Sequence, residues 1–183
     1  MRRYAKLLFV AATAVIAASA AALPDWPHAA EALAQLDYVS PEGDFSVGFP
    51  GPPEVAGRAP ESDTAPGFWT YRAQDDHAAY QVRVDVYPKA IRVPAPNPRT
   101  YEFILRAHAT ESSGQLVSTA PVQIGDRVGM EGVFTYPSGL TEVLRVVMAG
   151  HRVYQVTYTQ ADAGAPVGQG GAFLGSFVFI PRP

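Results

Sequence analysis

The residue types that most often carry chemistry are sparse in this chain. It has four histidines and no cysteine, and no two histidines fall at the spacing that binds one metal ion. His108 stands out because it lies on the apolar stripe of a predicted helix. Such a histidine can serve as a base or as a ligand above a sheet, or it can be a partly buried side chain with one satisfied hydrogen bond. The second interpretation is favoured, and His108 is kept as a candidate ligand-binding residue.

The triplet Asp75-Asp76-His77 holds the densest set of possible metal ligands. A metal site there would need further ligands from elsewhere in the chain, whereas a hairpin tip needs none, because aspartate is an ordinary turn residue. The turn is therefore the prediction. The glycine run Gly168–Gly171 lacks the lysine and the strand-to-helix context of a phosphate-binding loop, so phosphate binding is not expected.

Five aromatic side chains complete the set of candidate ligand-binding residues. If the sheet curves, they could line a cavity for a small apolar ligand. Otherwise they form the core beneath the predicted helix, or cross-strand pairs worth about 0.2–1 kcal/mol each. The core is favoured, because a sheet with one helical cover needs bulky side chains to fill the gap. These residues are Trp69, Tyr71, Tyr80, Tyr154 and Tyr158.

Known catalytic patterns are absent from the sequence, which contains no G-x-S-x-G, no H-E-x-x-H, no Walker loop and no dinucleotide fingerprint. The sequence therefore predicts no catalytic residue, no metal centre and no cofactor. We expect a protein that is not an enzyme and that works by binding.

The elements that would position these residues are centred on a hairpin over Glu142–Gln160, with a tight turn at Gly150-His151. Apolar residues alternate on both of its strands, which is the pattern of half-buried strands around a two-residue turn. We expect Val146 and Val156 to point into one core, beneath the residues of a helix over 97–113. That helix is predicted from a cap at Asn97, a proline at its first position and a terminating glycine at 114, and its apolar stripe is Tyr101, Ile104, Leu105 and His108.

The remaining segments predict an α+β fold with one antiparallel sheet and the helix over 97–113 packed on one face. The segment 50–67 is predicted as a loop, and 163–171 as glycine-rich and irregular. A short helix is predicted over 28–36. Strands are predicted over 38–40, 44–49, 68–73, 79–87, 116–120, 122–124, 130–136, 142–149, 152–160 and 173–180.

The first 22 residues have the architecture of a secretory signal peptide, with a basic start, an alanine-rich apolar run and small residues at a cleavage site. We expect residues 23–37 to form an N-terminal segment and 38–183 a single domain. Without Arg2, Arg3 and Lys6, the 14 basic and 17 acidic residues become 11 and 17, so the mature chain is acidic. Such a chain is a poor ligand for nucleic acid, and no second apolar segment predicts stable membrane insertion.

The run Tyr38–Pro50, with its Ser40–Gly43 turn and its Phe49-Pro50 strand end, resembles the start of PsbP-like domains. The segment Phe173–Phe177 resembles the closing part of the same domains. The resemblance implies a small exported bacterial protein of a kind that mostly lacks assigned activity. Together with the signal-like N-terminus and the missing catalytic patterns, it predicts a periplasmic or secreted protein that binds an unknown envelope partner. Two alternatives stay open, a carrier of a small apolar ligand in an aromatic-lined pocket and a hydrolase.

Overall fold

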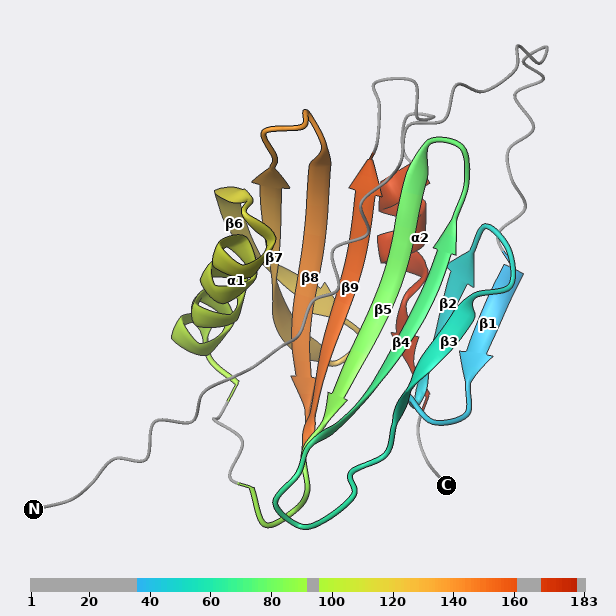
Figure 1. The fold of residues 1–183 in the computed structure, drawn as a ribbon, viewed down its shortest axis with the longest axis vertical. Coiled ribbons are helices and arrows are strands. Elements are labelled where there is room, and N and C mark those ends of the chain that lie inside the picture. Colours follow the sequence, from blue (N-terminus) through green and yellow to red (C-terminus); the bar gives the residue numbers. More distant parts are fainter. Residues whose placement is uncertain (1–35, 92–95, 161–168, 181–183) are drawn as a thin grey trace, which may run out of the picture. The chain divides into compact units, whose positions relative to one another are not determined.

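The computed structural model describes residues 36–91, 96–160 and 169–180, which fold as antiparallel sheet with two helices (Figure 1). An α+β fold, mostly antiparallel sheet, is thereby confirmed. The predicted signal peptide and nearly all of the predicted helix over 28–36 lie outside the described residues. Neither helix within the described ranges has the length and apolarity that a membrane span requires.

The strands form two sheets, so the prediction of a single sheet is wrong. The large sheet has the order β3-β4-β5-β9-β8-β7-β6, and the small sheet has the order β1-β2-β10. Phe45, Val47 and Phe49 alternate into the core as predicted. That alternation shows that one face of β2 is buried. It does not show that β2 belongs to a separate sheet, which covers the large sheet instead of extending it.

All strands pair antiparallel, through connections most of which are short. Those of the small sheet are β1 (Leu36–Ser40), β2 (Phe45–Phe49) and β10 (Val178–Phe179). Those of the large sheet are β3 (Glu54–Arg58), β4 (Gly67–Gln74), β5 (Ala78–Val86), β6 (Gln115–Ile124), β7 (Arg127–Thr135), β8 (Thr141–Ala149) and β9 (Arg152–Gln160).

Two strands differ from their predictions. β3 lies inside the predicted loop over 50–67, and all five of its residues are exposed, so it has no apolar alternation to reveal it. β6 is one strand instead of two segments separated at Pro121. A proline is tolerated in it because β6 lies at the edge of its sheet, where no strand of the described residues pairs with one side of the backbone.

Helix α1 (Pro98–Ser112) confirms the predicted helix. The side chain of Asn97 accepts a hydrogen bond from the backbone N–H of Thr100, and Pro98 occupies the first turn. The chain leaves the helix at Ser113, which takes the left-handed conformation instead of the predicted glycine, while the N–H of Gly114 donates to the carbonyl of Ala109.

Helix α2 (Gln169–Ser176) replaces the first half of the strand predicted over 173–180, so that prediction is wrong up to Ser176. The buried residues Phe173, Leu174 and Phe177 are spaced by one and three positions, which suits a helical face better than a strand. Gly170 lies on the same face, where an added Cβ atom would come within 2.6 Å of the Tyr158 ring.

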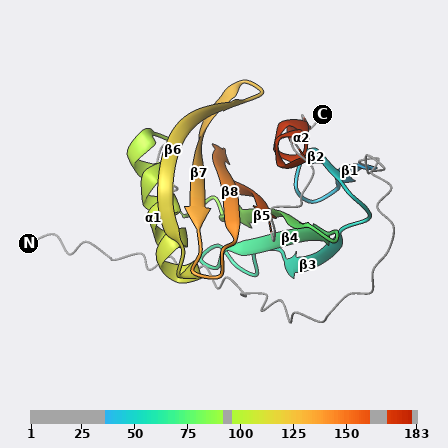
Figure 2. The ribbon, with the colours of Figure 1, turned by 90° about the horizontal axis from the view of Figure 1, so that it is seen from above.

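The two helices lie on opposite faces of the large sheet, α1 against β6, β7 and β8, and α2 against β9 and the small sheet (Figure 2). Val146 pairs with Gln155, and Val156 pairs with Arg145. Because paired residues share a face, the two valines point to opposite faces. The prediction that they share one core is wrong, since Val146 packs with Leu105 of α1 and Val156 belongs to the core under the small sheet.

Candidate functional site

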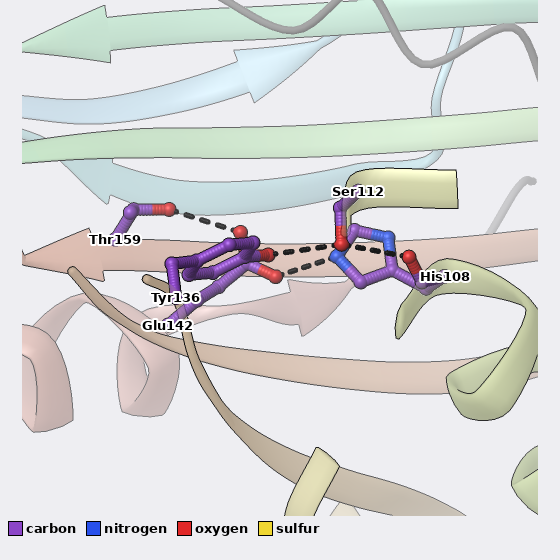
Figure 3. A network of polar contacts seen from close by, with 5 residues as sticks. All are labelled: His108, Ser112, Tyr136, Glu142 and Thr159. Carbon is purple, nitrogen blue, oxygen red and sulfur yellow. Dashed lines mark hydrogen bonds and ion pairs between the residues drawn. The ribbon is translucent and has the colours of Figure 1, made fainter. Parts of the chain in front are cut away.

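A polar network joins α1 to β8 and β9 around His108 (Figure 3). The Nε2 atom of His108 lies 2.6 Å from Oε1 of Glu142, and the two side chains are only 13% and 10% exposed. The other carboxylate oxygen of Glu142 accepts a hydrogen bond from Oγ1 of Thr159 at 3.2 Å. The register explains this assembly, because Glu142 pairs with Thr159 on one side and with Phe134 on the other. The His108 ring meets the Phe134 ring edge to face at 5.1 Å.

A second chain of hydroxyls lies beside this pair at the end of α1. Ser112 donates to the carbonyl of His108 at 2.7 Å, and the Tyr136 hydroxyl donates to Ser112 at 3.2 Å. Burial raises the pKa of Tyr136 to about 12, against the lowering effect of its bond with Ser112 and with a further rise from the nearby Glu142 carboxylate. Tyr136 also lines a hollow of about 280 Å³, together with Ser113, Gly114, Gln115, Thr135 and Pro137.

The geometry orients the imidazole without completing a catalytic arrangement. Catalysis by a hydroxyl nucleophile, a histidine base and an orienting carboxylate would need the other ring nitrogen of His108 to reach a hydroxyl. Within the described residues, no hydrogen bond joins that nitrogen to a hydroxyl, and Ser112 is engaged with the backbone. The network therefore acts as a tie that holds α1 on the sheet.

The predicted candidate residues do not meet at one site. All five aromatic candidates belong to the core between the large sheet and the small sheet with α2, whereas His108 lies on the opposite face of the large sheet. The Tyr71 ring packs on Phe45 at 5.0 Å and the Tyr80 ring on Phe173 at 5.1 Å, while Trp69 lies partly buried beside them. Their placement agrees with a core, although a core under the small sheet instead of under α1.

The hydroxyls of two buried tyrosines find partners within this core. Tyr71 accepts from the Ser40 hydroxyl at 2.7 Å, and burial raises the pKa of Tyr71 to about 12. Tyr80 donates to the carboxylate of Asp75 at 2.7 Å, and burial together with that carboxylate raises the pKa of Tyr80.

Asp75 is a turn residue, as the turn interpretation of its triplet predicts. One of its oxygens accepts the N–H groups of His77 and Ala78 at 2.8 Å, and the other accepts from Gln169 at 2.9 Å. The carboxylate thus fixes the β4–β5 turn and links it to the start of α2. Within residues 36–91, 96–160 and 169–180, no three histidine or carboxylate side chains converge in a way that could hold a metal ion.

A polar face extends across β4, β5 and β9 on the same side of the large sheet as α1. We define it by Arg72, Gln81, Arg83, Asp85 and Gln155. Arg72 donates to Gln81 at 2.8 Å, Arg83 donates through two nitrogens to Asp85 at 2.9 and 2.8 Å, and Gln155 donates to Asp85 at 3.0 Å. Among the described residues, no helix or strand of the structure packs over this face.

Sequence reasoning missed Glu142, Tyr136 and Thr159 as members of the network. A signal was present for Glu142, because it lies two residues before Leu144 on the apolar stripe of β8 and carries a charge where the pattern calls for an apolar side chain. No comparable signal marks Tyr136 or Thr159. Comparison with models of known protein families and with curated proteins finds no match to this chain.

Proposed function

We propose that this protein is an exported, non-enzymatic binding domain of the cell envelope, periplasmic or secreted, with a PsbP-like fold. The observation that carries the proposal is the polar face of β4, β5 and β9. The signal-like N-terminus supports export, and the hairpin of β1 and β2 over the Tyr38–Pro50 run is in keeping with the PsbP-like resemblance.

The polar face suits binding because its planar side chains are held in place before any partner arrives. Their mutual hydrogen bonds reduce the conformational entropy that a contact would otherwise cost. Within the described residues, the terminal nitrogens of Arg72 and the amide nitrogen of Gln81 make no hydrogen bond. These donors can therefore meet the acceptors of a ligand or of a protein partner.

The arrangement around His108 supports a binding role over catalysis. Its Nε2 atom and both oxygens of Glu142 are engaged in bonds that tie α1 to the sheet. A hydrolase, the third of the expected functions, would need the other ring nitrogen of His108 to reach a nucleophilic hydroxyl, and within the described residues no hydrogen bond joins the two. Screening for esterase and peptidase turnover, with His108→Ala as the matched variant, tests it directly.

Capture from the native envelope tests the proposal. Protein carrying Arg72→Ala and Gln81→Ala is compared with Arg99→Ala, which removes an equal charge from the exposed surface of α1. We expect the double variant to lose at least about 90% of the captured partner and the control to keep it. Equal capture by the double variant and the unmodified protein would exclude the polar face as the binding site.

The carrier alternative rests on the aromatic core beneath α2. A ligand there would have to displace the rings of Phe173 or Phe45, which now contact Tyr80 and Tyr71. Native mass spectrometry of protein purified from its own host distinguishes the two functions. A bound small apolar molecule would favour the carrier, and its absence together with a captured partner would favour the binding domain.

A further inference from the structure

We propose that the outer edge of β6 is a docking site for an extended segment of a partner polypeptide, which adds to the large sheet as a further strand. β6 lies at one end of this sheet, and β7 is its only strand partner within the described residues. Seven of its ten residues are exposed. This edge is separate from the polar face of β4, β5 and β9, so the inference stands independently of the proposed function.

The two edges of the large sheet differ in how they are protected. Natural proteins protect an edge strand by making it short or by placing charges on it. β3 follows this rule, because it has five residues and carries Glu54 and Arg58. β6 has ten residues and none of them is charged. Its protection is limited to Pro121 and to a bulge at Val117, which is 57% exposed.

The turn between β6 and β7 determines which backbone groups face outward. Gly125 and Asp126 form a two-residue turn, so its flanking residues Ile124 and Arg127 are the pair that exchanges hydrogen bonds. Antiparallel pairs alternate between bonded and non-bonded, which turns the N–H and C=O groups of every second residue away from β7. On β6 the outward groups belong to Thr119, Pro121 and Gln123.

The position of Pro121 agrees with this alternation. It also distinguishes between two possible partners of the edge, a second copy of β6 and a segment of another polypeptide. A proline at an outward position removes no bond from the β6–β7 ladder. If two copies of β6 paired about a two-fold axis, each copy would place Pro121 in the new ladder. Because proline has no backbone N–H, one carbonyl of each copy would then lack a donor, and two hydrogen bonds would be lost. A partner segment without proline loses a single bond at this point. The edge therefore suits a heterologous segment better than a second copy.

The side chains that border the edge define the chemistry of the segment. Thr119, Pro121 and Gln123 lie on one face of β6, and Ser118, Ala120 and Val122 lie on the other. All six are uncharged and most are small. A segment that pairs beside them needs an extended conformation and uncharged, β-branched side chains, because a charge would have no counterpart on this edge.

The test uses a library of soluble ten-residue peptides displayed on phage and selected on the purified protein. Thr119→Pro removes an outward donor without touching the β6–β7 ladder, and Thr119→Ala keeps the donor as the matched control. We expect enriched peptides to be uncharged, to bind the control as they bind the unmodified protein, and to bind Thr119→Pro about tenfold more weakly. A failure to enrich any peptide, or equal binding to both variants, would overturn the proposal.

A second measurement does not depend on the folding of a variant. Hydrogen exchange of the unmodified protein is recorded with and without an enriched peptide, and protection is expected at the amides of Thr119 and Gln123. Protection confined to other strands would overturn the proposal. So would sedimentation that shows the protein alone to be a dimer with these two amides already protected, since the occupant would then be a second copy.

Discussion

The paired side chains of His108 and Glu142 allow a quantitative test of how α1 is held. Glu142→Leu removes the acceptor that lies 2.6 Å from the His108 ring and 3.2 Å from the Thr159 hydroxyl. Only 10% of the Glu142 side chain is exposed, so water cannot fully replace the lost partner. A buried polar group left unpaired costs about 1–3 kcal/mol. We expect the free energy of unfolding to fall by about 2–4 kcal/mol, out of a total of roughly 5–15 kcal/mol.

The double variant His108→Phe with Glu142→Leu separates the pair from its parts. Replacing both partners by apolar groups of similar size leaves no orphaned polar atom in the pair, so much of the stability should return. Urea unfolding followed by circular dichroism measures all four proteins of the cycle. Glu61→Leu is the control, because its ion pair with Arg58 is 68% and 61% exposed and should contribute less than about 1 kcal/mol. If the costs of the two single variants simply add in the double variant, the tie described here is refuted.

Three further predictions follow from other parts of the fold. Gly171→Ala should raise the free energy of unfolding by up to about 1 kcal/mol, because nothing lies within 4 Å of the added Cβ and alanine favours the helix. Gly170→Ala should lower the melting temperature, because its Cβ would press on the buried ring of Tyr158. Tyr71 and Tyr136 have pKa values raised from 10.0 to about 12, so between pH 10 and 12 the unfolded chain loses these protons first. Unfolding free energy should then fall by up to ~3 kcal/mol for each, as alkaline urea melts would reveal. Pro121→Val restores an outward donor on β6 and should raise self-association, measurable by sedimentation.

Local signals in the sequence predicted much of the fold. Asn97 and Pro98 locate the start of α1, and Gly150 locates a two-residue turn, because each acts through its own backbone geometry. The face of each strand was harder to assign. Val143 and Val147 make β8 apolar on both sides, and a strand of that kind does not reveal which core each side enters.

The site was less predictable than the elements, for a related reason. His108 was found because a polar residue on an apolar stripe is visible in the sequence. Its partner Glu142 lies 34 residues away, and their contact depends on α1 crossing β8 at one particular point. The helical nature of α2 was missed because Phe173 lies in a short, strongly apolar segment, and a continuous apolar run of that length is also typical of a buried strand.

The small sheet joins the first described strands to the last one, and this has a consequence for the order of folding. The N–H of Gly48 is bonded to the hydroxyl of Ser176, which is 128 residues later in the chain, and β2 pairs with β10. A chain made from its N-terminus cannot complete this layer until almost all of it has been synthesised. Phe45 and Phe49 must stay without their final packing until then. A polypeptide that completes its core this late stays incompletely folded for longer during synthesis, as the export proposed above would require.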